Sequence, residues 1–153
     1  MVTYDRNGAY VQFLLSNYTT EVSVQEAINL IPDTPGSDYN NEPAYALQLI
    51  NSTVFNPQNI RPTAQLVVVL VTDSPSAMPA QELAARNALF SRGVHLIAIS
   101  ANSNSVQLRE LRSIASSITD VISVNGYQLL LPQVDQLASI MCPNQQGLSA
   151  LFR

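Results

Sequence analysis

The sequence predicts an α/β fold of three layers, doubly wound, in which helices cover a mostly parallel sheet with one antiparallel edge strand. The first observation is the aliphatic run Leu66–Val71, followed by Thr72 and Asp73, because a short, continuous, β-branched run is typical of a strand covered on both faces. The second is the alternation of helical and strand-like segments after this run. The third is Asn7-Gly8, a type I′ hairpin signal that precedes an alternating segment.

The remaining elements follow from caps, turns and apolar spacing. Ser23 and Glu26 form a capping-box pattern, and Pro79 stands where a helix can start without losing a hydrogen bond. We expect a hairpin of strands Val2–Tyr4 and Ala9–Leu15, followed by two helices, Val24–Ile31 and Pro43–Val54. After the central strand Leu66–Thr72, helices and strands should alternate. The expected strands are Val94–Ser100 and Val121–Val124, and the expected helices start at about Pro79, start after a cap at Ser105, and run through Val134 to Met141. We expect one domain over residues 1–142 and a tail over 143–153.

Composition narrows the classes of partner. A chain of 153 residues with 46% hydrophobic content is long enough for one buried core. Its 7 basic and 11 acidic residues give a net charge of −4, and no basic run is present that could follow a phosphate backbone, so nucleic acid is not an expected partner. The apolar runs are far shorter than the roughly 20 residues that cross a bilayer, so we expect no membrane insertion.

Three further residues bear on the compartment. Asn17 and Asn51 each begin an Asn-x-Ser/Thr sequon and would be glycosylated in a secretory pathway. Cys142 is the single cysteine, so it is either a buried thiol or its partner lies elsewhere, outside this sequence.

The chemistry suggested by the residues centres on Asp73. Ligands of parallel sheets bind beyond the carboxyl ends of the strands, where Asp73 is placed. The alternative role of this carboxylate is structural, as a cap or in the turn that follows. A small α/β hydrolase using Asp73 and Ser74 is a competing hypothesis, although it lacks a Gly-x-Ser-x-Gly elbow and needs a third catalytic group. His95, the only histidine, fits a packed strand residue.

Taken together, these segments resemble the von Willebrand factor type A domain, which also occurs as the inserted domain of integrins and in collagen-associated matrix proteins. The resemblance extends over nearly the whole chain up to Cys142. It is carried by the following segments: Val2-Thr-Tyr4, the edge strand ending in Phe13, Ala46-Leu47 with Val54-Phe55, Leu70-Val-Thr-Asp73, Arg92-Gly-Val94 with Ile97-Ala-Ile99, and Leu111 with Ile114-Ala-Ser116.

The resemblance implies an incomplete domain. Members of the family open with a strand ending in Asp-x-Ser-x-Ser and a long helix, and neither is found in this sequence. We therefore expect a domain truncated at its amino terminus, with backbone groups left unpaired where that strand would lie.

The resemblance also implies a metal-ion-dependent adhesion site, in which a divalent cation, commonly Mg²⁺, accepts oxygen ligands from three loops and a carboxylate from the partner. Here the implied ligands are Asp73 and Asn41. With one carboxylate and no Asp-x-Ser-x-Ser hydroxyls, we expect a degenerate site that binds Mg²⁺, Mn²⁺ or Ca²⁺ weakly or not at all in this chain.

The function expected from the resemblance is a non-enzymatic adhesion module, secreted or in the ectodomain of a larger protein, that binds a collagen or another matrix component. The partner would contact the rim near Asp73, with Ser37, Asp38, Tyr39 and Ser74 as candidate contacts. Cys142 would form a disulfide with a cysteine outside this chain. A structural matrix spacer without metal is the second alternative, beside the hydrolase.

Overall fold

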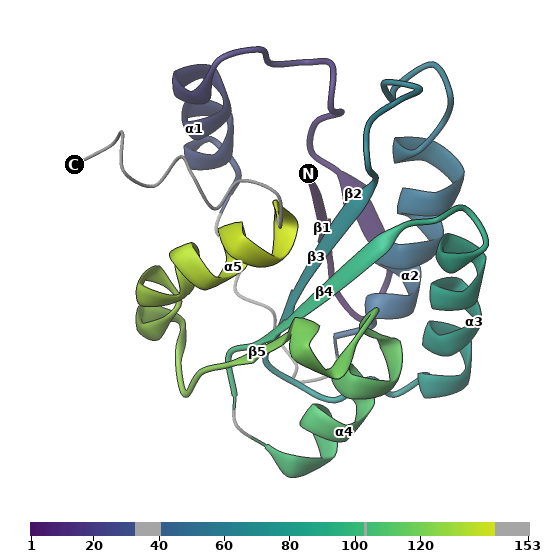
Figure 1. The fold of residues 1–153 in the computed structure, drawn as a ribbon, viewed down its shortest axis with the longest axis vertical. Helices are drawn as coiled ribbons and strands as arrows, with labels where there is room; N and C mark the ends of the chain where they lie inside the picture. Colours follow the sequence, from purple (N-terminus) through teal and green to yellow (C-terminus); the bar gives the residue numbers. More distant parts are fainter. Residues whose placement is uncertain (33–40, 103, 143–153) are drawn as a thin grey trace. The chain divides into compact units, whose positions relative to one another are not determined.

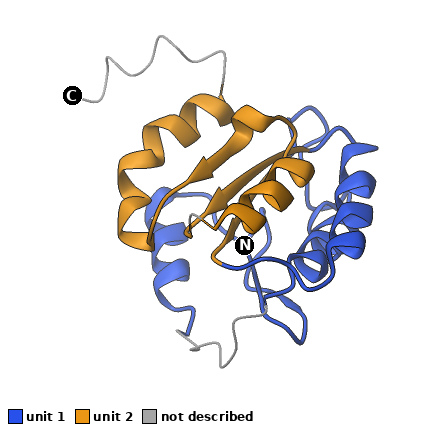
Figure 2. Cartoon of the chain, turned by 90° about the horizontal axis from the view of Figure 1, so that it is seen from below, with its two compact units in different colours: residues 1–66, 74–94 blue, residues 67–73, 95–153 orange. Residues whose placement is uncertain are grey.

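The structure, a computed structural model, describes residues 1–32, 41–102 and 104–142 and has the expected α/β fold (Figure 1). The chain divides into two compact units, residues 1–66 with 74–94 and residues 67–73 with 95–153, which we call unit 1 and unit 2 (Figure 2). The predicted tail, 143–153, lies outside the described residues.

Unit 1 combines an antiparallel hairpin with helices. Its elements are β1 (Val2–Tyr4), β2 (Ala9–Val11), α1 (Glu21–Asn29), α2 (Pro43–Leu49), the π-helical turn η1 (Ile50–Val54) and α3 (Pro79–Phe90). The hairpin pairs Val2 with Val11 and Tyr4 with Ala9. Helix α2 packs against both strands and against α3, which buries Ala44 and Leu47 completely.

The hairpin turn differs from the predicted type I′ turn. That type needs a positive φ at both central residues, whereas the described residues have positive φ only at Gly93 and Gly126. Asp5 holds the turn instead, because its Oδ1 accepts hydrogen bonds from the backbone N–H groups of Asn7 (2.7 Å) and Gly8 (3.0 Å). The paired strand is also shorter than predicted and ends at Val11.

The first helix starts earlier than the sequence pattern indicates. Thr20 is the N-cap: its Oγ1 accepts from the N–H of Ser23 at 3.2 Å, and the Ser23 hydroxyl accepts from the N–H of Thr20 at 3.3 Å. The predicted box of Ser23 with Glu26 is therefore wrong, since Ser23 is the third helical residue. The earlier start places Glu21 in the first turn, where its negative charge favours the helix dipole.

Unit 2 contains the parallel sheet. Strands β3 (Val67–Thr72), β4 (His95–Ser100) and β5 (Val121–Ser123) are hydrogen bonded in the order β3-β4-β5. The register pairs Val67 with His95 and Thr72 with Ser100. The other elements are α4 (Ser105–Ile114), the 3₁₀ turns η2 (Ile118–Asp120), η3 (Tyr127–Leu129) and η4 (Leu131–Gln133), and α5 (Val134–Met141).

The central aliphatic run forms the predicted strand, but only one of its faces is buried. Val68 and Leu70 are buried, whereas Val69 and Val71 are 36% and 38% exposed. The reason is that η4 and α5 cover this second face incompletely: they leave an apolar cavity of about 360 Å³ whose lining includes Val69, Val71 and Leu137. The strand covered on both faces is β4, which lies between the other two strands of the sheet.

Helices α4 and α5 lie on opposite faces of this sheet (Figure 2). Gln107 of α4 is fully buried, and its Oε1 accepts a hydrogen bond from the Ser100 hydroxyl at 3.0 Å. Ser100 points to the same face as Val68 and Leu70, because it is the register partner of Thr72 and side chains alternate along a strand. Unit 2 is therefore a three-layer arrangement of helix, parallel sheet and helix.

The N-cap of α4 provides a test of this local structure. Asn104 caps the helix by accepting from the Val106 N–H at 2.8 Å, whereas the predicted cap, Ser105, is the first helical residue. We predict that Asn104→Ala lowers the free energy of unfolding by about 1 kcal/mol because one amide loses its acceptor. The matched control Ser105→Ala should change it by less than about 0.5 kcal/mol. Urea unfolding measures both, and the reverse ranking would contradict the assignment.

Candidate functional site

The candidate site lies at the carboxyl end of the parallel sheet in unit 2, where Asp73 directly follows β3. Two hydrogen bonds align the loops there. The Ala101 N–H donates to the Thr72 carbonyl at 2.9 Å, and the Gly126 N–H donates to the Ala101 carbonyl at 2.9 Å. The backbone thus brings the residues that follow β3, β4 and β5 side by side. Asp73 is half-buried at this edge.

The side chain of Tyr127 meets Asp73 at this edge. The Tyr127 hydroxyl makes a side-chain hydrogen bond with the Asp73 carboxylate. Partial burial, together with the negative charge and the hydrogen bond of Asp73, raises the pKa of Tyr127 to about 12. The sequence analysis missed Tyr127. The available signal was Gly126, a turn residue just before it at the end of a strand.

Gly126 sets the direction of the backbone just before Tyr127. Its φ is +119°, a conformation that side-chain-bearing residues rarely adopt, and an added Cβ would lie 2.6 Å from the side-chain atoms of Gln128. The turn η3 follows at once, with the Leu129 N–H donating to the Gly126 carbonyl at 3.1 Å. Tyr127 is therefore placed by the backbone on both sides of it.

The predicted metal ligands do not form a cation site within one unit. Asn41 is half-buried in unit 1 and Asp73 belongs to unit 2, so their pairing stays a prediction. Within residues 1–32, 41–102 and 104–142, no group of three or more His, Cys, Asp or Glu side chains could hold a metal ion. The Asp73 carboxylate also accepts a hydrogen bond from the Tyr127 hydroxyl, and weak or absent binding of a divalent cation by Asp73 and Asn41 stays a prediction.

The other predicted contacts are distributed as follows. Ser37, Asp38 and Tyr39 lie outside the described residues, and Ser74 is half-buried at the start of the loop before α3. A carboxylate that the sequence analysis missed organises this loop. Glu42 is only 4% exposed, and it accepts from the Ala77 N–H at 3.1 Å and from the Ser76 hydroxyl at 3.3 Å. Its role in unit 1 is to hold the chain ahead of α3.

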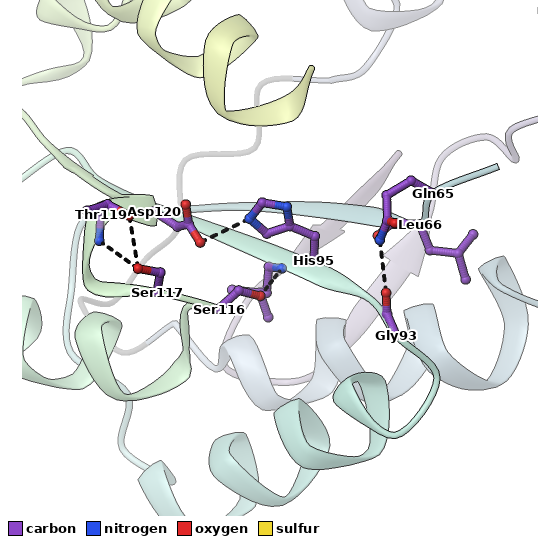
Figure 3. Close-up of polar contacts among 9 residues, drawn as sticks. Gln65, Leu66, Gly93, His95, Ser116, Ser117, Thr119 and Asp120 are labelled. Atoms are coloured by element: carbon purple, nitrogen blue, oxygen red, sulfur yellow. Dashed lines mark hydrogen bonds and ion pairs between the residues drawn. The ribbon is translucent and has the colours of Figure 1, made fainter. Parts of the chain in front are cut away.

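His95 lies at the other end of the parallel sheet. Its Nε2 is 3.0 Å from Oδ2 of Asp120. Figure 3 shows the two side chains pointing toward each other. His95 is also the register partner of Val67 at the start of β3. Since Asp73 follows the far end of β3 and a strand rises about 3.3 Å per residue, roughly 16 Å or more separates the two ends. His95 therefore cannot supply the third group that a hydrolase with Asp73 and Ser74 would need.

The two sequons differ in their surroundings. Asn17 is exposed in a loop, where its Oδ1 accepts from the Leu14 N–H at 2.6 Å. Asn51 is half-buried in η1, and its Oδ1 accepts from Nη1 of Arg92 at 2.8 Å. Asn17 thus has more room for a glycan than Asn51. Cys142 is exposed, and its disulfide to a cysteine outside this chain stays a prediction.

The contact between Asp73 and Tyr127 gives a pH prediction. Tyr127 should titrate near pH 12, about two units above an ordinary tyrosine. In Asp73→Asn the pKa of Tyr127 should fall, because the negative charge that opposes ionisation is gone. The sign for stability follows: the contribution of this contact is complete below pH 10 and is lost as the pH rises from 10 to 12. Tyrosinate absorbance measures the titration, with Tyr127→Phe identifying the signal, and an unchanged pKa in Asp73→Asn would contradict the contact.

Comparisons with known proteins agree with this geometry. The sequence profile of the von Willebrand factor type A domain matches residues 1–136. Crystal structures of proximal thread matrix protein 1 from the mussel byssus are similar at a TM-score of 0.83 and 22% sequence identity, and one of them has a zinc-occupied MIDAS motif. The match covers 92% of this chain and 35% of the chain in the first of these structures, so this chain spans about a third of that protein. No curated protein sequence matches.

At 22% identity the structural similarity supports only the fold. The profile match covers residues 1–136, most of the chain, and therefore shows the family. The hairpin, the parallel strands and the carboxylate at their end are all found within the matched residues. The chain therefore belongs to the von Willebrand factor type A family.

Proposed function

We propose that this chain is a non-enzymatic, protein-binding module of the extracellular matrix. The profile match shows its family. The similar solved structure is that of proximal thread matrix protein 1, whose name describes a matrix protein. The observation that carries the proposal is the placement of Asp73, half-buried at the carboxyl edge of the parallel sheet with the loops after β4 and β5 aligned beside it. Edges of this kind are where open α/β sheets bind ligands.

The partner in this proposal is a collagen or another matrix protein. It contacts the edge around Asp73, with Ser74 and the sequence-predicted residues Ser37, Asp38 and Tyr39 as further contacts. In this chain Asp73 and Asn41 hold a divalent cation such as Mg²⁺ weakly or not at all. The donor types support this view, because one carboxylate and one amide oxygen are few ligands for a hard cation, which prefers several oxygen ligands.

A secreted or ectodomain location completes the proposal. The exposed Asn17 and the exposed Cys142 are the features that support it, as a glycan acceptor and as one half of a disulfide to a cysteine outside this chain. Among the described residues, no helix combines the length and apolar character needed to span a membrane.

A structural spacer that assembles matrix chains without metal is the second candidate. The hydrogen bond between Asp73 and Tyr127 favours it, because such a bond gives the carboxylate a structural role that needs no ligand. A hydrolase is less well supported, since the only histidine is bonded to Asp120 at the opposite end of the sheet.

Binding to immobilised matrix proteins, with collagen first, separates the two candidates. If the edge near Asp73 is the docking surface, Asp73→Asn should weaken binding by about tenfold, equivalent to about 1.4 kcal/mol. Asp135→Asn is the matched control, because Asp135 is an exposed carboxylate on α5 in the same unit and should leave binding unchanged. Surface plasmon resonance with and without EDTA measures both. Equal binding by the two variants, or no binding to any matrix protein, would refute the proposed function.

A further inference from the structure

Helix α5 is apolar in sequence, but the fold leaves its apolar side chains incompletely packed. Five of its eight residues are apolar, and none of them is buried. Val134 is 53% exposed, and Leu131 in the preceding turn η4 is 80% exposed. A single exposed apolar side chain is ordinary, whereas a contiguous set of them marks a surface that another segment or molecule covers. The apolar side chains of η4 and α5 therefore indicate a contact surface in unit 2.

An apolar cavity adjoins this surface, between α5 and the parallel sheet. Val69 and Val71 of β3, Ile99 of β4 and Leu137 of α5 are among its lining residues, and Gln133 is the one polar residue of the described lining. Its volume of about 360 Å³ lies within the range of about 300–1,000 Å³ that is typical of ligand pockets. All of these residues belong to unit 2. Apolar side chains around an open space lack the close contacts of a packed core, so an apolar group that fills the space stabilises the unit.

Residues 143–153, which follow α5 and lie outside the described residues, have a sequence suited to this cavity. Their large apolar side chains all come after Gly147. Leu151 and Phe152 follow Leu148 by three and four residues, the spacing that places apolar side chains on one face of a helical turn. The segment thus offers an apolar face to an apolar cavity.

The segment is also long enough to return to the cavity. Helix α5 ends at Met141, and Cys142, with φ −129° and ψ 64°, lies outside the helical region. Pro143 does not continue the helix, because it has no N–H to donate. From Leu137 to Cys142 the helix rises by about 7.5 Å, whereas the residues from Cys142 to Leu148 span up to about 20 Å. A chain that reverses after α5 therefore reaches back beyond Leu137.

We propose that residues 148–152 dock in the apolar cavity of unit 2, where Leu151 and Phe152 pack against Val71 and Leu137. The occupant is a segment of the same chain, because its tether keeps it beside the cavity at an effective concentration of about millimolar, which a second copy or a separate partner has to supply in solution. The contact goes beyond the proposed function. It covers a face of the sheet, whereas the matrix partner is proposed to bind at the carboxyl edge, so its failure would leave the proposed function untouched.

The test compares methyl NMR spectra of the full chain and of Phe152→Ala. An aromatic ring shifts the resonances of methyl groups packed against it, so Phe152→Ala should move the methyl resonances of Val71 and Leu137. The methyl resonances of Leu111 should stay in place, because Leu111 is buried on α4, at the opposite face of the sheet (Figure 2). Gln145→Ala is the matched control, since it changes the same segment outside its apolar face, and it should shift none of these resonances.

An apolar dye measures independently whether the cavity is filled. The fluorescence of 8-anilinonaphthalene-1-sulfonate rises when the dye binds apolar surface that is open to water. The double variant Leu151→Ser/Phe152→Ser should raise this fluorescence several-fold over that of the unchanged chain, because it leaves the cavity open to the dye.

Methyl resonances of Val71 and Leu137 that stay in place in Phe152→Ala would overturn the proposal. Shifts that vanish on dilution would also overturn it, because the cavity then binds a second copy of the chain. Equal dye fluorescence from the unchanged chain and the double variant has the same consequence, since the segment then does not fill the cavity. The dispersion of the methyl spectrum reports whether each variant is folded, and Phe152→Ala alone decides the matter if the double variant does not fold.

Discussion

The parallel pairing of β3 with β4 is the constraint on which unit 2 depends. It runs in register from Val67 and His95 to Thr72 and Ser100, and the Ala101 N–H extends it by one bond to the Thr72 carbonyl. Side chains at the two ends of this pairing are fixed far apart. Asp73 is therefore delivered to the carboxyl edge, and His95 is committed to Asp120 at the amino edge. The separation of Asp73 from the His95–Asp120 pair follows from the register.

The burial of β4 stabilises its pairing with β3. Its residues from Leu96 to Ser100 are all buried, with Leu96, Ile97, Ala98 and Ser100 at 0% exposure and Ile99 at 5%. Burial of this kind contributes roughly 25 cal/mol for each Å² of apolar surface removed from water. The hydroxyl of Ser100 is satisfied in this core by Gln107. Because β4 is fixed from both faces, the loop that carries Ala101 is fixed as well, and Asp73 and Tyr127 are aligned through it.

The sequence predicted the elements better than their ends. Aliphatic runs and apolar spacing identify β3, β4, α3 and α5, because periodicity reflects burial over many residues. Caps depend on single side-chain hydrogen bonds, so the sequence analysis placed both N-caps too late in the chain. It predicted Ser23 where Thr20 is the cap, and Ser105 where Asn104 is the cap. The partial exposure of Val69 and Val71 was also missed, since no local pattern reports how completely η4 and α5 cover a strand.

The candidate site was predictable in part. Asp73 follows from the rule that carboxyl ends of parallel strands carry ligand-binding residues, and the family resemblance supplied the expectation of a cation there. Tyr127 could not be found in this way, because its meeting with Asp73 depends on hydrogen bonds from Ala101 and Gly126 that join segments distant in sequence. The buried carboxylate of Glu42 was missed for the same reason, since its acceptor role involves Ser76 and Ala77.

A double-mutant cycle on Asp73 and Tyr127 is the most direct test of this account, whose central claim is that the two side chains are coupled. Urea unfolding of the unchanged chain, Asp73→Asn, Tyr127→Phe and the double variant gives the coupling free energy. Residues in contact usually show about 0.5 kcal/mol or more, and the exposure of Tyr127 favours the low end of that range. A favourable coupling of about this size is the result we expect. Strictly additive effects of the two substitutions would contradict the account.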